Sequence, residues 1–127
     1  MPKQTLAVLS DTFTIHSLPD DASIPPLVFK EPVYFIGKTH EELSLVVPNT
    51  IDVQSEDSDT DWRALEVLGP LSLSMVGIMA QISSVLAQAK VSIFILSTFE
   101  TDFFLVKQQQ LQTAADALRQ DGYNVNL

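Results

Sequence analysis

The polar residues at positions 97–102 separate two apolar runs, VSIFIL before them and FFLV after them. Such an interruption predicts a hairpin between two strands. Asp102 lies where the second strand begins, and its carboxylate could accept hydrogen bonds from an ammonium or another cationic group. Thr98 could add a hydroxyl and Phe99 an apolar cover, whereas Glu100 is expected to face solvent. The alternative is an ordinary turn, in which Asp102 binds its own backbone and Phe99 only completes a strand.

A second candidate group surrounds Gly77, at the start of a predicted helix. The first backbone N–H groups of a helix lack partners within the helix and carry partial positive charge, which suits a carboxylate. Gly77 has no side chain, so a ligand could approach the backbone closely, although close helix–strand packing explains a glycine equally well. Core packing is the simpler interpretation of the apolar side chains nearby. The predicted ligand contacts at this helix start are Met75, Val76, Gly77 and Ile78.

The other residue types give little support to catalysis or metal binding. The chain has no Cys, which excludes disulfides, thiolate metal sites and a Cys nucleophile. His16 and His40 are far apart and lack the spacing of metal-binding motifs. The four glycines are isolated from one another, so no phosphate-binding loop is expected. We predict no catalytic residue, no metal site and no cofactor, while a triad assembled from distant Ser, His and Asp residues stays open.

Composition and charge restrict the partners. The 127 residues suffice for one domain or two very small ones, and 46% hydrophobic residues can form a core. The formal net charge is −9, and the seven basic residues are scattered. Because phosphate groups are bound by clustered cations, we expect no nucleic acid and no membrane surface as a partner. No apolar run is long enough for a membrane span or a secretory signal, so we expect a cytoplasmic protein.

The second half of the chain predicts a complete α+β unit. One helix is expected after Ser72 or Ser74, with an apolar stripe to Ala89, and a second over 109–122 that stops at Gly122. The order β-α-β-β-α-β predicts a ferredoxin-like sandwich, with an antiparallel sheet covered on one face by two helices. The predicted strands are 62–69, 91–97, 102–107 and 123–127.

The first half is rich in predicted strands and poor in helices. Four prolines between positions 19 and 32 argue against a long helix there. The acidic segment 52–61 has almost nothing apolar and predicts a solvated linker. A turn is expected near Ser10. The predicted strands are 5–10, 12–18, 33–39 and 43–48.

Three sequence blocks together resemble the ACT-domain family of small-molecule-binding regulatory modules. The first block, GPLSLSMVGIMAQISSVLAQAKVSIFIL, is similar to the ACT order of strand, glycine-containing turn, helix and strand. The second and third blocks are STFETDFFLV and KTHEELSLVVP, and they resemble segments of one branch of the family. That branch holds aspartate-kinase-like tandem ACT proteins, mostly uncharacterised and bacterial, together with cytosolic arginine sensors. The resemblance implies two ACT-like halves that share or adjoin antiparallel sheets: 1–61, degenerate and strand-rich, and 62–127, a C-terminal ACT domain.

The resemblance also implies a function. It implies a regulatory protein that binds an amino acid without catalysis, at an interface between ACT units, and it implies a homodimer and a regulated protein partner. Ser44 and Leu45 match a segment that faces the site in this branch, although a plain edge or core strand is the alternative for them. With the resemblance, a ligand role is also favoured for Asp102. The complete predicted set is Ser44, Leu45, Met75, Val76, Gly77, Ile78, Thr98, Phe99 and Asp102.

Two other functions remain as alternatives. A purely structural module would mediate dimerisation or docking without a ligand. A small ferredoxin-like enzyme is also compatible, because a fold does not determine a function. The sequence leaves the identity of the ligand open, and also whether the last strand pairs with its own half.

Overall fold

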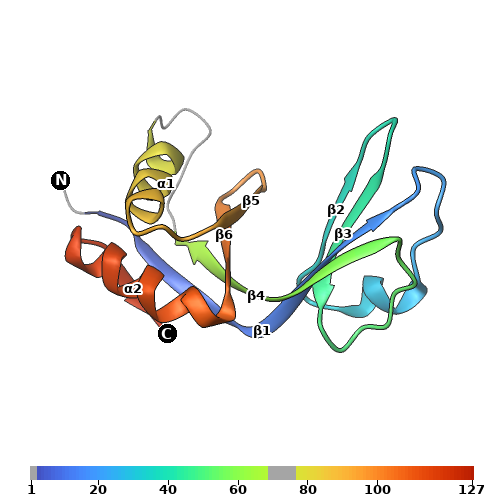
Figure 1. The fold of residues 1–127 in the computed structure, drawn as a ribbon, viewed down its shortest axis with the longest axis horizontal. Coiled ribbons are helices and arrows are strands. Elements are labelled where there is room, and N and C mark those ends of the chain that lie inside the picture. The colour runs from blue at the N-terminus through green and yellow to red at the C-terminus, as the bar shows by residue number, and fades with distance from the viewer. Residues whose placement is uncertain (1–2, 69–76) are drawn as a thin grey trace. The chain divides into compact units, whose positions relative to one another are not determined.

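The computed structural model of the chain describes residues 3–68 and 77–127 (Figure 1). The chain forms two compact units, which we describe separately. The terminal unit consists of Met1–Ser10 and Arg63–Leu127, and the inserted unit is Asp11–Trp62. The sequence analysis divided the chain at 61/62. In the structure, the first ten residues are part of the same compact unit as the C-terminal residues. Strands β1 (Thr5–Leu18) and β4 (Asp57–Val67) each contribute one end to each unit.

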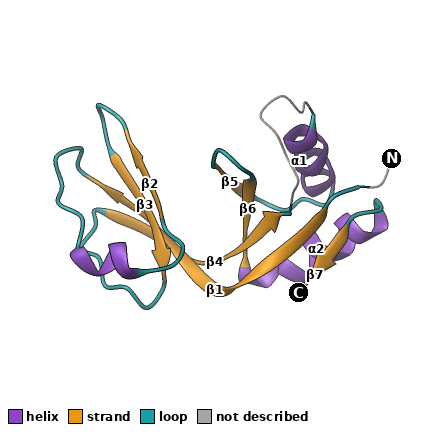
Figure 2. Cartoon of the chain, turned by 180° about the vertical axis from the view of Figure 1, so that it is seen from behind, coloured by secondary structure: helices purple, strands orange, loops and turns teal. Residues whose placement is uncertain are grey.

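The terminal unit is a sheet with two helices, α1 (Ile78–Gln88) and α2 (Leu111–Gln120), as the purple coils of Figure 2 show. Its strand order is β7-β1-β4-β6-β5. The remaining elements are β5 (Ile93–Ser97), β6 (Asp102–Lys107), β7 (Asn124–Asn126) and a short 3-10 helix, η2 (Gln108–Gln110). Both helices share one hydrophobic core with the sheet. That core contains Leu6, Leu65, Val67, Ile82, Leu86, Val91, Phe104, Val106, Ala114, Ala115, Leu118, Tyr123 and Val125.

The last strand, β7, pairs with β1 and not with β4. The pairing is parallel, with Leu6 opposite Val125, and both side chains lie in the core. The sequence predicted an antiparallel sheet and left the partner of this strand open. The first part of β1 lies between β4 and β7 in the sheet, so β7 pairs with β1 in place of β4.

Both helices of the terminal unit end in the same hydrogen-bond pattern, the Schellman motif. After α1, the Val91 N–H donates to the Leu86 carbonyl at 3.0 Å, and Lys90 has a φ of 62°. After α2, the Tyr123 N–H donates to the Leu118 carbonyl at 3.0 Å. Gly122 has a φ of 99° there, so the stop predicted at this glycine is confirmed.

All residues of the inserted unit are described, and none of them is in an α-helix. Its elements besides the ends of β1 and β4 are a 3-10 helix, η1 (Pro26–Lys30), and strands β2 (Phe35–Lys38) and β3 (Leu43–Pro48). The strand order is β2-β3-β1-β4, and β3 is antiparallel to both neighbours. The prediction that the prolines prevent a long helix is confirmed. A separate core contains Leu18, Val28, Leu43, Leu45 and Val47.

Two sequence expectations for the first half were wrong. No turn interrupts the chain near Ser10, because β1 runs continuously through it and pairs with β7 at one end and β3 at the other. The acidic segment 52–61 is not a solvated linker. Ile51 and Val53 pack against the core of the inserted unit, and the backbone from Asp57 onwards forms the first part of β4 while its charged side chains remain exposed.

Candidate functional site

Figure 1 shows the β5–β6 hairpin of the terminal unit. Thr98 and Thr101 close its turn. The Thr98 N–H donates to the Thr101 carbonyl at 2.8 Å, and the Thr101 N–H donates to the Thr98 hydroxyl oxygen at 3.2 Å. The Thr101 hydroxyl donates to the backbone carbonyl of Val67 at the end of β4. The hydroxyl of Thr98, predicted as a ligand contact, is therefore already engaged in the turn.

Asp102 begins β6 directly opposite Ser97, the last residue of β5. The Ser97 hydroxyl donates to Oδ1 of Asp102 at 2.6 Å, and the Asp102 side chain is partly buried. The described residues form no other hydrogen bond with this carboxylate. Asp102 consequently does not cap its own turn, a task that Thr98 performs, and its second carboxylate oxygen can accept a hydrogen bond from a ligand.

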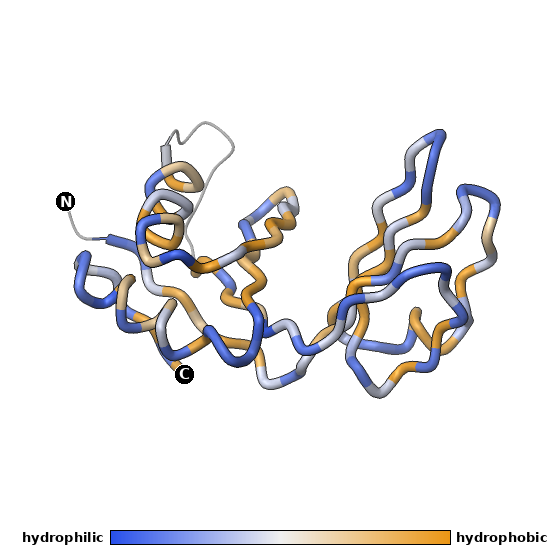
Figure 3. Tube along the Cα trace, viewed as in Figure 1, coloured by the Kyte–Doolittle hydropathy of each residue, from blue (hydrophilic) through white to orange (hydrophobic). Residues whose placement is uncertain are grey.

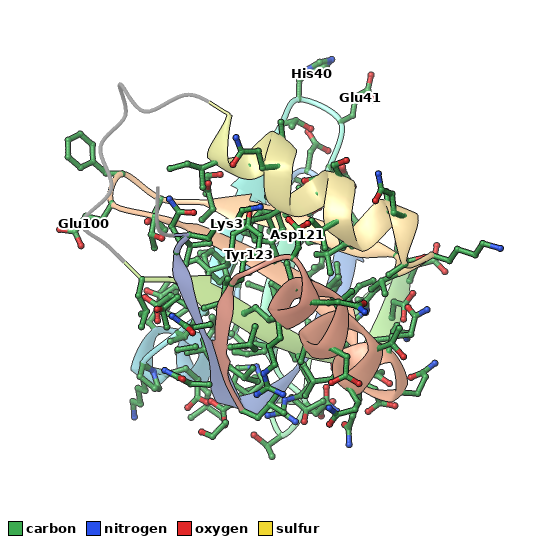
Figure 4. All side chains as sticks on the ribbon, turned by 90° about the vertical axis from the view of Figure 1, so that its left-hand side faces the viewer. Lys3, His40, Glu41, Glu100, Asp121 and Tyr123 are labelled. Carbon is green, nitrogen blue, oxygen red and sulfur yellow. The ribbon has the colours of Figure 1, made fainter. Side chains whose placement is uncertain are left out.

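The tip of this hairpin carries Phe99 and Glu100. Phe99 is 80% exposed, so it does not complete a strand as the ordinary alternative proposed. Glu100 is exposed and points away from the ribbon in Figure 4, as expected. Below the tip, the strands are strongly hydrophobic, as the orange colour of β5 and β6 in Figure 3 shows. The tip therefore offers an exposed ring and a carboxylate on a hairpin whose strands are anchored in the sheet.

Gly77 is the N-cap of α1 and has a φ of 83°. Among the described residues, no side chain caps this helix start, and its first turn has no acidic residue. Within the described ranges, a Cβ added to Gly77 would meet only the Gln81 side chain, at 3.8 Å, so packing against the described strands is not what requires glycine here. The positive φ requires it. Ile78 packs against the core, while Met75 and Val76, like Ser72 and Ser74, lie outside the described residues.

Ser44 and Leu45 lie in β3 of the inserted unit. Leu45 is completely buried in the core of that unit, and its backbone pairs with β2 on one side and β1 on the other. The core-strand alternative therefore describes Leu45. Ser44 is partly buried. The structure thus groups Thr98, Phe99 and Asp102 on one hairpin, and it places Gly77 and Ile78 at a helix start of the same unit.

Neither histidine lies beside a carboxylate in a cleft. His16 is buried in β1, and its Nδ1 lies 2.9 Å from the Ser55 hydroxyl. Burial lowers the pKa of His16. His40 Nε2 lies 3.4 Å from a carboxylate oxygen of Glu41, but both side chains are exposed at the tip of the β2–β3 hairpin, as Figure 4 shows. No group of three or more His, Asp or Glu side chains within the described ranges could hold a metal ion.

Sequence reasoning missed a groove between α1 and α2 of about 270 Å³. No motif marks it, since its lining consists of apolar and amide side chains and one carboxylate at the ends of two helices. Near one end, Lys3 Nζ lies 2.6 Å from Asp121 and 4.9 Å from the centre of the Tyr123 ring, and Figure 4 labels these three residues. None of the predicted site residues contributes to it. The groove is lined by Val85, Gln88, Ala89, Ala117, Gln120 and Asp121.

Comparison with known proteins gives a family match and several relatives. A family model described as an ACT domain matches residues 57–120. A rat (Rattus norvegicus) protein named cytosolic arginine sensor for mTORC1 subunit 1 is 29% identical over 134 residues, which cover 96% of this chain and 40% of that protein. The mouse (Mus musculus) protein of the same name is 27% identical, with 94% and 39% covered. The chain thus spans about 40% of the length of these curated relatives.

Solved structures show the same fold. A protein from Agrobacterium tumefaciens is 28% identical, with a TM-score of 0.89 over 98% of this chain and 93% of that chain. The regulatory subunit of aspartate kinase from Thermus flavus has a TM-score of 0.67 at 14% identity, with 94% and 98% covered. At that identity, the second likeness concerns the fold alone.

No helix in the described part of the chain is both long and apolar enough to cross a membrane.

Proposed function

Because the chain belongs to the ACT-domain family, we propose that it is a regulatory protein that binds a free amino acid through its terminal unit. ACT domains are typically ligand-binding regulatory domains, and the family match is the observation that carries the proposal. The matched residues, 57–120, include the start of α1 and the β5–β6 hairpin. The curated relatives are named as arginine sensors, so L-arginine is the first ligand to test.

The proposed site uses complementary charges. The N–H groups at the start of α1, which no described side chain caps, would bind the α-carboxylate of the ligand. The Asp102 carboxylate would accept hydrogen bonds from a protonated nitrogen, and Phe99 would cover the bound molecule. Gly77 would permit close approach to the backbone. The other proposed contacts in this unit are Thr98 and, outside the described residues, Met75 and Val76, while Ile78 would hold the helix start in place through its packing. Ser44 of the inserted unit stays a prediction from the family resemblance, and Leu45 is a core residue of that unit.

The proposed mechanism is regulatory and not catalytic. A ligand shifts an equilibrium between two arrangements only by its difference in affinity for them, so the amino acid would favour one arrangement of ACT units. That arrangement would then control a protein partner. The names of the relatives include the word cytosolic, and we extend this location to the chain.

We also propose that the chain forms a homodimer through β5. This strand is the last in the strand order, and its sequence, IFILS, has no charged residue and no proline. Edge strands without such protection tend to pair with another strand. Sedimentation should give twice the chain mass of 14.0 kDa. A single chain mass at micromolar concentration would exclude this dimer.

The same edge favours the second candidate, a purely structural dimerisation module without a ligand.

Thermal unfolding in the presence of each of the twenty amino acids separates the two candidates. A ligand at 100 times its Kd stabilises a folded protein by about 2.7 kcal/mol. For a domain of this size, that should raise Tm by several degrees. At millimolar concentration, at least one amino acid should therefore raise Tm. If none does, amino-acid binding is rejected and the structural module is preferred.

A further inference from the structure

Arg63 in β4 is a partly buried cation without a carboxylate partner. Its Nη2 donates to the backbone carbonyl of Leu9 in β1 at 3.0 Å, and it forms no ion pair with any described residue. Residues 1–2 and 69–76, outside the described ranges, include no Asp or Glu. The chain has 16 acidic residues for 7 basic ones, yet none of their carboxylates pairs with Arg63.

The guanidinium of Arg63 is also incompletely hydrogen-bonded. Its Nε is buried, and no described residue forms a hydrogen bond with it. Proteins seldom bury a charged group unless an opposite charge or hydrogen bonds compensate for the lost water. The other arginine of the chain, Arg119, also donates to a backbone carbonyl, that of Val125, but Arg119 is exposed. Water can therefore solvate Arg119, whereas Arg63 needs a partner that the chain does not supply.

Strand geometry places Arg63 on the face of the sheet that the helices cover. Successive side chains of a strand point to opposite faces, so Arg63 shares a face with Leu65 and Val67. Leu65 and Val67 belong to the core that both helices share with the sheet. β6 is the neighbour of β4, and the Thr101 hydroxyl contacts the Val67 carbonyl where β4 ends. From there, β6 can lie beside β4 only by running back toward Arg63, so the far end of β6 lies at the Arg63 end of this pair.

The residues that follow β6 bring no negative charge to this end of the sheet. In Figure 1, the chain passes from the end of β6 directly into the segment that forms η2 and α2. Neither of these helices has an acidic residue in its first turn. On this side, Arg63 therefore faces no competing carboxylate, and an anion from outside the chain would meet no repulsion there.

We propose that Arg63 anchors a binding site for a small oxyanion from solution, a carboxylate or a phosphate. A guanidinium presents its N–H donors in a rigid planar fork that matches two oxygens of either group. After the bond to the Leu9 carbonyl, Nη2 still has one N–H group and Nη1 has two. The bound anion neutralises the charge that the chain leaves unpaired, and charge-assisted hydrogen bonds hold it at the end of the guanidinium.

This anion site is separate from the proposed amino-acid site. Four residues of β4 separate the Cα atoms of Arg63 and Val67 by about 13 Å. Asp102 follows Thr101, whose hydroxyl contacts the Val67 carbonyl. Because the α-ammonium and the α-carboxylate share one carbon atom, an amino acid held at Asp102 cannot also place its α-carboxylate at Arg63. The proposal thus goes beyond the proposed function and does not depend on it.

Nuclear magnetic resonance can observe Arg63 directly in the full chain. Arg63 and Arg119 are its only arginines, so a nitrogen–proton correlation spectrum contains one side-chain Nε–H signal from each, and Arg119→Lys assigns them. Sodium phosphate and sodium acetate are the probes, added in HEPES buffer at an ionic strength held constant with sodium chloride. At least one probe should shift the Arg63 signal in a saturable way at millimolar concentration, while the Arg119 signal stays in place. The probe that shifts it identifies the class of anion.

Thermal unfolding of variants gives an independent measurement. The bound probe should raise Tm above that in sodium chloride of equal ionic strength, which controls for general screening of the net charge of −9. Arg63→Met should weaken binding roughly 10- to 100-fold, and Arg63→Lys, which keeps the charge but lacks the fork, roughly 3- to 10-fold. Arg119→Met is the matched control and should keep the full response.

Two results would overturn the inference. One is an Arg63 signal that neither probe shifts at millimolar concentration, or that shifts no more than the Arg119 signal. The other is a Tm response that Arg63→Met retains. If Arg63→Met does not fold, the spectrum of the unmodified chain and the response of Arg63→Lys decide. Either negative result leaves the amino-acid proposal standing, because that proposal is tested by the twenty-amino-acid measurement.

Discussion

Burial in the inserted unit favours the neutral form of His16. The side chain is 7% exposed and lies opposite Leu45 of β3, with the Ser55 hydroxyl at Nδ1. Its Nε2 is buried, and no described residue forms a hydrogen bond with it. Desolvation disfavours the charged imidazolium, and the pKa is lowered for this reason. His16 is thus a core residue, and its protonation state affects the stability of the fold.

Acid should destabilise the chain through His16. In the unfolded chain, histidine titrates near pH 6.5, and the folded chain binds its proton only at lower pH. The contribution of neutral His16 to the stability of the fold is therefore complete above about pH 6.5 and is lost as the pH falls below that value. Between pH 7.5 and pH 5.0, the urea midpoint should fall more for the unmodified chain than for His16→Gln. His40→Gln, at an exposed site, is the control, and equal falls in all three proteins would refute the expectation.

Only part of the candidate site could be predicted from the sequence. Asp102 stood out because a charged residue interrupts an apolar pattern. Its partner Ser97 did not, because the two meet only through the antiparallel register of β5 and β6. For Gly77, the two explanations considered from the sequence were ligand approach and packing, and the structure adds a third, a positive φ at the helix start. Backbone conformation of this kind has no reliable signal in one sequence.

At the scale of elements, the helix ends show where the sequence agrees with the backbone and where it does not. Both helices end with a residue at positive φ: Gly122 after α2 and Lys90 after α1. Glycine adopts this conformation freely, whereas an L-residue with a side chain pays about 1–2 kcal/mol. The surrounding bonds, from Val91 to Leu86 and within the last turn of α1, nevertheless hold Lys90 there.

Lys90→Gly should therefore stabilise the chain. Glycine removes the free-energy cost of the left-handed conformation, and this gain exceeds the entropic cost of the greater flexibility of glycine in the unfolded chain. The expected gain in unfolding free energy is about 0.5–1 kcal/mol. Urea denaturation would measure it. Lys90→Ala is the matched variant, because it removes the same charge but keeps a Cβ, and it should give no gain. If alanine stabilises as much as glycine, the charge and not the conformation is responsible.

The elements with a strong periodic pattern were predicted well. Both helices and the strands of the two hairpins are confirmed, with ends shifted by a few residues. The errors occurred in β1, which was divided by a false turn, and in β4, whose acidic first part resembles a linker. In both strands, backbone pairing with distant segments outweighs local composition.

At the scale of the whole molecule, the terminal unit is discontinuous in sequence. Leu6, from the first ten residues, is fully buried in the same core as Leu65 and Phe104. β1 also lies between β4 and β7 in the strand order. Removing the N-terminal half therefore takes away both a core side chain and a central strand. The C-terminal part of the chain cannot complete its own sheet.

A fragment of residues 62–127 should consequently fail to fold cooperatively. The loss of a buried leucine alone costs about 2–5 kcal/mol, which is a large share of the stability of a small domain. Circular dichroism during heating should show no sharp transition for the fragment. The full chain, measured in the same buffer, should show one. A fragment with the Tm of the full chain would support the simple division at 61/62 instead.

The sequence by itself determined the family and the ferredoxin-like class, because these depend on local patterns: two helical stripes, two hairpins and the residues around them. Only the tertiary structure decided that β1 runs through both units, that β7 pairs with it in parallel, and that the Ser97 hydroxyl donates a hydrogen bond to Asp102. Each of these depends on contacts between distant or cross-strand residues. Such contacts are selected by the shared burial of many side chains, and no local segment contains that information.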